Sequence, residues 1–187
     1  MRTGLYSAAE APKRDGMNQP SKPSSRKVID RHLYVPHYLV VLANGMERGQ
    51  SRIYLKHFGI GINEARIITV IAHSGPLTAA EISEILVMNK SITSRSMQVL
   101  EGMGLVSIGD SKRSRPIQLT DEGYALHDRI VAVSLAREKL MLDGFSPNEK
   151  TIVLGYLARM FNNMELANAI DPLEVEREVR PTARQSP

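Results

Sequence analysis

The spacing of hydrophobic residues predicts a chain that is mainly α-helical. In residues 30–57, apolar side chains recur at the period of a helix, which predicts a first long helix there. Gly59 and Gly61 interrupt this pattern, and Asn63 is a good N-cap for a second helix that ends at Ser74. A long helix followed by a shorter one is therefore expected in the first half of the chain.

Two short helices separated by a tight turn are predicted next. Thr78 and Glu81 have the spacing of a capping box, in which each side chain hydrogen-bonds the backbone amide of the other residue. A third helix is expected to run from this box to about Leu86. A fourth helix is predicted to start near residue 89 or 90 and to end at the Gly-Met-Gly run of residues 102–104.

One face of the fourth helix is expected to be buried and the other exposed. Its apolar positions fall with the small Ser96 on one face at helical spacing, namely Ile92, Val99, Leu100 and Met103. The remaining positions are then expected to point outward, namely Lys90, Ser94, Met97 and Gln98.

A two-stranded hairpin is predicted after the fourth helix. Short apolar runs at residues 105–108 and 116–119 are separated by a polar loop that contains Lys112, Arg113 and Arg115. The expected hairpin therefore has a basic tip.

Two further helices are predicted in the last third of the chain. Thr120 precedes a long helical region from residue 124 to residue 137 and beyond, and Ser146 with Pro147 has the form of another helix start. A short helix is expected from Pro172 onward.

The order of helix, short turn, helix and basic hairpin is that of a winged helix-turn-helix. The second helix of such a motif enters the major groove, where small hydroxyl or amide side chains can approach and hydrogen-bond base edges. Cations on the hairpin suit phosphates or the narrower minor groove. The candidate DNA-binding residues are Lys90, Ser91, Thr93, Ser94, Arg95, Gln98, Lys112, Arg113 and Arg115.

The composition fits one soluble domain with tails. The chain has 187 residues, of which 42% are hydrophobic and 24% charged, and no apolar run approaches the ~20 residues of a membrane helix. It has no cysteine, and its N-terminus lacks the apolar core of a secretory signal. A cytoplasmic, nucleoid-associated protein of bacterial type, with no membrane partner, is therefore expected.

Positive charge is concentrated in the predicted DNA-binding part. The whole chain has a formal net charge of only +4. Residues 90–118 contain five basic and two acidic residues, which gives this segment a net charge of +3. The net charge of the whole chain is weak evidence for DNA binding, but its concentration in residues 90–118 agrees with a DNA-binding motif in that segment.

The predicted organisation has two tails, a DNA-binding module and a divided helical region. The long flanking helices carry more apolar surface than a module of this size can cover, which indicates a homodimer. The expected parts are a flexible basic N-terminal tail (1–27), a helical dimerisation region (28–60 and 121–170), a winged helix-turn-helix domain (61–120) and a C-terminal tail (171–187).

Four segments, in this order and spacing, resemble the MarR-type (multiple antibiotic resistance regulator) winged-helix repressors. The likeness covers roughly residues 30–165, although the sequence departs from the family pattern at Ala65, where tryptophan is usual, and at Ser111, where aspartate is usual. The segments are residues 58–62 with 64 and 66–68, residues 75–78 with 81 and 82, residues 93–95 with 100–106, and residues 119, 120 and 123.

The resemblance implies a fold, a function and an effector site. The fold is mainly α with a small β-hairpin wing, and the first, fifth and sixth helices form the dimer. The function is that of a homodimeric repressor of a pseudopalindromic double-stranded DNA operator, released by a small effector such as an aromatic carboxylate. Polar and aromatic residues of the first two helices would line the effector site, namely His37, Tyr38, Tyr54, His57 and Arg66.

An enzyme is not expected. The sequence has no Gly-rich phosphate loop, nucleophile elbow or paired-carboxylate motif, and its five histidines show no pair at metal-ligand spacing. No catalytic residue, metal or cofactor is therefore predicted. Two alternatives stay open: a winged helix that binds an acidic protein partner, and an architectural DNA-binding protein without ligand response.

Overall fold

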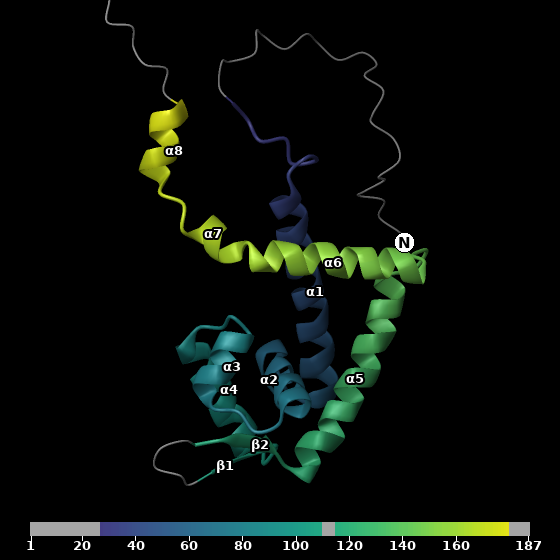
Figure 1. The fold of residues 1–187 in the computed structure, drawn as a ribbon. Coiled ribbons are helices and arrows are strands. Elements are labelled where there is room, and N and C mark those ends of the chain that lie inside the picture. Colours follow the sequence, from purple (N-terminus) through teal and green to yellow (C-terminus); the bar gives the residue numbers. More distant parts are fainter. Residues whose placement is uncertain (1–26, 110–114, 180–187) are drawn as a thin grey trace, which may run out of the picture. The chain divides into compact units, whose positions relative to one another are not determined.

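The computed structural model describes residues 27–109 and 115–179, which form eight helices and one two-stranded sheet (Figure 1). The chain divides into two units, Met1–Arg52 and Ile53–Pro187. The elements are α1 (Val35–Phe58), α2 (Ile62–Ser74), α3 (Ala79–Ile85), α4 (Lys90–Gly102), β1 (Val106–Ile108), β2 (Ile117–Leu119), α5 (Asp121–Met141), α6 (Pro147–Asn162), α7 (Met164–Asn168) and α8 (Pro172–Val179).

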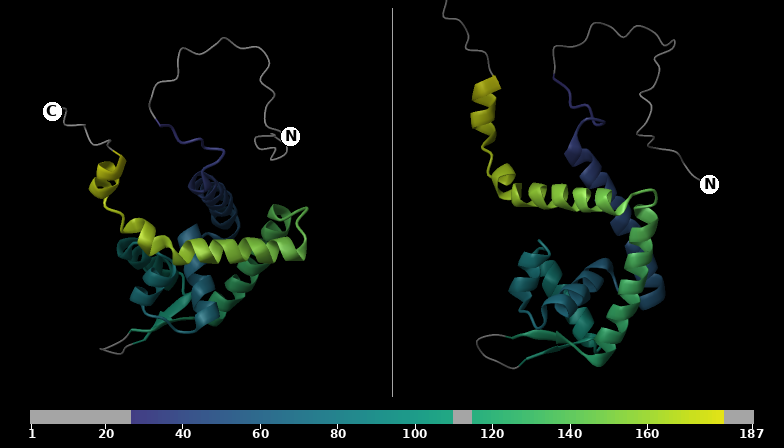
Figure 2. Two further views of the ribbon diagram at one scale, coloured as in Figure 1. Left: turned by 45° about the horizontal axis from the view of Figure 1, so that its top comes forward. Right: turned by 45° about the vertical axis from the view of Figure 1, so that its right-hand side comes forward.

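Helices α2, α3, α4 and α5 and the hairpin surround one hydrophobic core in the second unit. Five residues of α2 are buried, and α2 contacts α3, α4, α5 and β2. The hairpin is antiparallel, with Val106 opposite Leu119 and Ile108 opposite Ile117, and it lies against α2 through β2 and against α4 through β1 (Figures 1 and 2). Leu77 pairs with Ile117 through two backbone hydrogen bonds of 3.1 and 2.8 Å, which joins the hairpin to the segment before α3.

The predicted fold class is confirmed. The described chain is mainly helical, and its α3–turn–α4–hairpin order is that of a winged helix-turn-helix.

Capping boxes begin two of the helices, and the sequence predicts the one at Thr78 and Glu81. The Thr78 hydroxyl accepts a 3.3 Å hydrogen bond from the Glu81 amide, and the Glu81 carboxylate accepts one of 2.7 Å from the Thr78 amide. Ser146 and Glu149 repeat this arrangement at α6. These local bonds satisfy amide groups that a helix start otherwise leaves unpaired.

The first two helix starts differ from the prediction. Helix α1 begins at Val35 and not at residue 30, because the Leu33 amide donates to the Asp30 carbonyl and forms a turn there. Helix α2 is preceded by Gly61 as its N-cap, so Asn63 lies inside the helix and does not cap it. Ile62 is buried as the first residue of α2, and this burial brings the helix start forward.

The later elements agree with the prediction apart from small shifts at their ends. Helix α5 begins at Asp121, three residues before the predicted start, because the Thr120 hydroxyl accepts from the Gly123 amide at 3.1 Å. The predicted short helix from Pro172 is α8. The predicted N-terminal tail lies almost wholly outside the described residues.

The turn between α3 and α4 contains an unusual backbone conformation. The Met88 amide donates to the Ser83 carbonyl at 2.9 Å, and the Val87 amide donates to the Glu84 carbonyl at 3.1 Å. This pair of bonds is the Schellman motif, whose left-handed residue is usually glycine. Here the left-handed residue is Val87, with φ of 50° and a side chain that is 76% exposed. A β-branched residue in this conformation is strained.

We expect Val87→Gly to raise the free energy of unfolding by about 0.5–1 kcal/mol. Relief of the left-handed strain is worth roughly 1–2 kcal/mol, and the greater freedom of glycine in the unfolded chain offsets part of it. Urea denaturation at equilibrium measures the change.

Gly104 provides the matched control for this substitution. It ends α4 with the same pair of hydrogen bonds and a φ of 70°, so Gly104→Val should lower the stability. Loss of stability in Val87→Gly would contradict the strain argument.

Candidate nucleic-acid interface

Helix α4 presents most of the predicted DNA-binding residues to solvent. Its N-cap is Asn89, whose side-chain oxygen accepts hydrogen bonds of 3.0 Å from both the amide and the hydroxyl of Ser91. The exposed predicted residues of this helix are Lys90, Ser91, Ser94, Arg95 and Gln98.

Thr93 does not belong to this exposed set. Its side chain is 1% exposed and lies within hydrogen-bond distance of Ser83 in α3. The prediction that Thr93 contacts DNA is therefore corrected: its side chain is part of the core.

The buried face of α4 is rotated from the predicted one. The residues that face the core are Thr93, Ser96, Met97 and Leu100, whereas the apolar Ile92, Val99 and Met103 are exposed. Burial of Leu100 and Ser96 is confirmed, but Met97 was expected outside. Thr93 and Ser96 place hydroxyl groups on the core side. The hydroxyl of Thr93 can be buried there because it has a hydrogen-bonding partner in Ser83.

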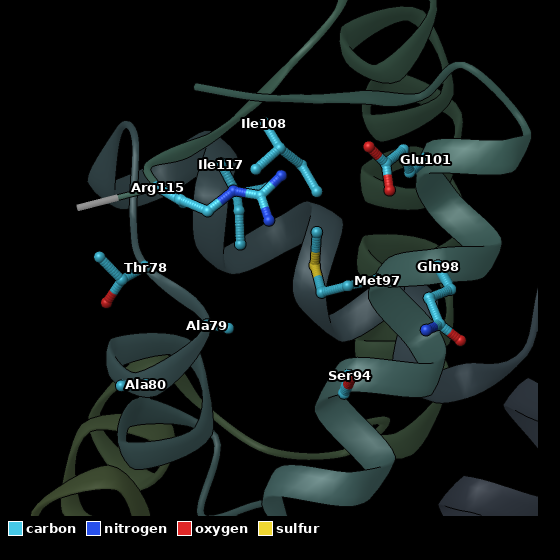
Figure 3. Close-up of a pocket in the computed structure, with 10 residues that line it drawn as sticks. All are labelled: Thr78, Ala79, Ala80, Ser94, Met97, Gln98, Glu101, Ile108, Arg115 and Ile117. Atoms are coloured by element: carbon cyan, nitrogen blue, oxygen red, sulfur yellow. The ribbon is translucent and has the colours of Figure 1, made fainter. Parts of the chain in front are cut away.

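A groove of about 600 Å³ separates α4 from the hairpin and the start of α3. Figure 3 shows Ser94, Gln98 and Glu101 following one another along α4, while Met97 points into the groove. The sequence indicated only three of the lining residues (Ser94, Gln98 and Arg115) as DNA-binding. It did not indicate the others, which are Thr78, Ala79, Ala80, Met97, Glu101, Ile108 and Ile117.

Arg115, which lies at the loop end of the hairpin two residues before β2, supplies a positive charge to this groove. Its side chain points into the groove beside Ile108 and Ile117 (Figure 3). Glu101 lines the same groove, and no ion pair joins it to Arg115 among the described residues. The other two predicted hairpin cations, Lys112 and Arg113, lie outside the described residues.

The start of α3 is held by an ionised carboxylate at the edge of the groove. Hydrogen bonds from the amide and the hydroxyl of Thr78 lower the pKa of Glu81 below its ordinary value. Because the folded-state pKa is lowered, the contribution of this bond is present at neutral pH and is lost as the pH falls through that pKa.

The start of α5 is fastened to the end of α4. The Thr120 hydroxyl donates to the Gly104 carbonyl at 2.8 Å, and the Thr120 amide donates to the Leu105 carbonyl at 3.1 Å. A Cβ atom at Gly123 would collide with the Leu105 carbonyl oxygen, so only glycine allows this close approach. This junction fixes the base of the hairpin relative to α4.

The predicted effector residues are divided between the two units. His37 and Tyr38 lie in the first unit, and Tyr54, His57 and Arg66 lie in the second. Side chains of His57 and Arg66 are exposed. The joint role of all five stays a prediction.

Tyr54 is a core residue, contrary to the expectation that it lines a ligand site. It is 2% exposed, and its hydroxyl lies 3.0 Å from the Ser134 hydroxyl of α5. Next to it, the Arg129 guanidinium lies 4.7 Å from the ring centre of Phe58 and donates to the His57 carbonyl at 3.3 Å. These contacts join the end of α1 to α5 within the second unit.

Residues 27–109 and 115–179 contain no cluster of three or more potential metal ligands. In the same ranges, no helix combines the length and the hydrophobicity needed to cross a bilayer.

Comparison with known proteins connects this geometry to one family. The model of the MarR family matches residues 58–115, which extend from the end of α1 through α2, α3, α4 and β1 and end before β2. The HTH-type transcriptional regulator PecS of Dickeya dadantii (strain 3937) is 29% identical over 121 residues, which are 62% of this chain and 72% of PecS. A MarR/EmrR family transcriptional regulator from Acinetobacter sp. ADP1 has a TM-score of 0.69 at 28% identity, over 74% of this chain and 99% of that one.

This chain is similar to transcriptional regulators of the MarR family in sequence and in fold. The curated relatives that it matches are transcriptional regulators, which agrees with the prediction of a regulator that is not an enzyme. The fold is also shared by the Staphylococcus aureus MepR–DNA complex, with a TM-score of 0.63 at 16% identity over 72% of this chain and 99% of that one.

Proposed function

We propose that this protein is a MarR-type homodimeric repressor that binds a pseudopalindromic operator in the cytoplasm and is released by a small effector. The observation that carries the DNA-binding part is the groove between α4 and the hairpin, where Ser94 and Gln98 stand opposite Arg115. An exposed helix face with hydroxyl and amide side chains can read bases, and an adjacent arginine can hold a phosphate. The MepR structure, which contains DNA, supports this use of the shared fold.

In this proposal, α4 reads the base sequence and Arg115 of the hairpin region contacts phosphate. Gln98 can donate to and accept from an adenine edge, so its loss should remove sequence information. Arg115 carries a charge at a position suited to phosphate, which all sequences share. The predicted contacts of Lys90, Ser91 and Arg95 fit the same division, since the first and the last are cations and Ser91 is a hydroxyl.

Dimer formation is supported by the surface of α6. This helix has 16 residues, none of which is buried in the single chain. Helices of this length are marginal in water unless an apolar face is packed. The exposed apolar side chains of α6 are Ile152, Leu154, Tyr156, Leu157, Met160 and Phe161. A second copy of the chain would cover them, and α1 and α5 would complete the dimerisation region.

An effector site on the first two helices is the third part of the proposal. His37, His57 and Arg66 offer polar groups that can meet a carboxylate, and Tyr38 offers a ring. A ligand shifts DNA binding only by its different affinity for the two states, so DNA must weaken ligand binding by the same factor.

Arg115→Ala and Gln98→Ala should alter DNA binding in different ways. Arg115→Ala should weaken binding to most sequences and reduce the slope of log affinity against log salt by about one per lost contact, or about two in a dimer. Gln98→Ala should cost ~1–3 kcal/mol for the preferred base and leave the slope nearly unchanged. Salt titrations with a selected and a scrambled duplex measure both effects.

Lys139→Ala, which removes an exposed positive charge from α5, is the control and should change neither quantity. If Arg115→Ala changed the sequence preference and Gln98→Ala changed the salt slope, the proposed roles of the two residues would be reversed. Binding without sequence preference would favour the architectural alternative. Absence of salt-dependent DNA binding would favour a protein partner.

Leu157→Glu together with Phe161→Glu should convert the dimer into monomer or aggregate, because two buried charges at a dimer interface would lack partners. Sedimentation velocity at micromolar concentration should show a dimer for the unmodified chain. Asn148→Glu with Asn162→Glu adds the same charge at polar positions of α6 and should leave the dimer intact. A compact monomer of the unmodified protein would refute the proposed assembly.

Aromatic carboxylates should weaken operator binding, and operator DNA should weaken carboxylate binding by an equal factor. Titration calorimetry with and without a selected duplex tests this reciprocity, with Arg66→Ala as the variant expected to lose it. A panel of such acids without any effect on operator affinity would count against an effector of this class.

A further inference from the structure

The buried serine and threonine side chains of residues 27–109 and 115–179 all belong to the helix-turn-helix. They are Ser83 of α3 and Thr93 and Ser96 of α4, and the other buried hydroxyl described above is that of Tyr54. Burial of a hydroxyl costs free energy unless it is hydrogen-bonded, and an apolar pair of similar size would fill the same space at no such cost. These hydroxyls therefore need an explanation beyond filling the core.

Ser83 and Thr93 form a directional link between the two helices. Their hydroxyl oxygens lie 2.9 Å apart, and Ser83 also lies 2.9 Å from the Ala79 carbonyl oxygen. The Thr93 hydroxyl is 3.4 Å from the Asn89 carbonyl oxygen, a longer contact. The Ser83 hydroxyl donates to the Thr93 hydroxyl, and the Thr93 hydroxyl in turn donates to the Asn89 carbonyl. The link is then complete within the buried interface.

The position of this link couples it to the groove. Thr93 is adjacent to Ser94 in the chain, and Gln98 follows about one turn later on the exposed side of α4. Apolar contacts are not directional and tolerate small shifts, whereas a hydrogen bond weakens as its distance and angle change. A link on the core side of α4 thus restricts the rotation and sliding that would move Ser94 and Gln98 away from base edges.

We propose that Ser83 and Thr93 are positioning residues, which hold α4 at the angle against α3 that base readout requires. This inference rests on the proposed role of α4 as the base-reading helix. Neither hydroxyl touches DNA in this account; both act through the orientation of α4.

The test compares sequence preference in full-length variants that keep the volume of the core. A preferred site is selected from a random duplex library with the unmodified protein, and dissociation constants are measured for that site and for a scrambled duplex. Thr93→Val replaces the hydroxyl by a methyl group, and it should reduce the ratio of the two constants roughly tenfold, about the size of one weakened base contact. Affinity for the scrambled duplex and its salt slope should stay unchanged.

Ser83→Ala should reduce the preference in the same direction, and the double variant should lose no more than Thr93→Val alone, because the two residues act as one link. Thr93→Ser keeps the hydroxyl and should restore most of the preference. The control for loss of a threonine hydroxyl as such is the exposed Thr69 of α2, whose hydroxyl donates to its own helix, to the Ala65 carbonyl at 2.9 Å; its substitution is Thr69→Val. This control should leave the preference unchanged.

The results separate this inference from the function on which it rests. An unmodified protein without any preferred sequence would overturn the proposed function. An unmodified protein with a preferred sequence, together with Thr93→Val and Ser83→Ala variants that are less stable but equally selective, would overturn the positioning role alone. Reduced selectivity in Thr69→Val would also overturn it, because the effect would then follow from any lost hydroxyl.

Discussion

Burial of the isoleucine side chains of α2 is the constraint on which the DNA-binding lobe depends. Ile67 and Ile68 are fully buried, and Ile71 is 1% exposed. Because α2 contacts α3, α4, α5 and β2, these side chains supply one core to all four, and α3 and β2 in particular are too short to be stable alone. Loss of one of these isoleucine side chains would therefore disturb all the elements that line the groove.

The groove is built from three segments whose positions are set by different interactions. Helix α3 is held at its start by the Thr78 capping box, the hairpin by the pairing of Leu77 with Ile117, and α4 by the core. The junction of Thr120 with the carbonyls of Gly104 and Leu105 then ties α5 to the same point. A movement of α5 would reach the hairpin base through this junction.

Backbone strain and a buried hydrogen bond both lie at the turn between α3 and α4. Val87 holds the turn in a conformation that favours glycine, and Ser83 with Thr93 joins the helices behind it. Val87 and the Ser83–Thr93 pair lie near the residues proposed to read DNA. At each of these positions, another side chain would make the fold more stable. Residues that reduce stability near a binding surface are consistent with a requirement on its geometry.

The sequence by itself determined the elements whose signals are local. Capping boxes, terminal glycines and alternating apolar residues act within a few positions, so α3, α4, the hairpin and the start of α6 were predictable, and with them the candidate residues Ser94, Gln98 and Arg115. Only the tertiary structure decided that Thr93 and Ser96 face the core while Ile92, Val99 and Met103 do not, and that Tyr54 is buried against Ser134. Periodicity locates an apolar stripe on a helix, but whether a hydroxyl can be buried depends on a hydrogen-bonding partner from another helix. That partner is ten residues away along the sequence for Thr93 and eighty for Tyr54.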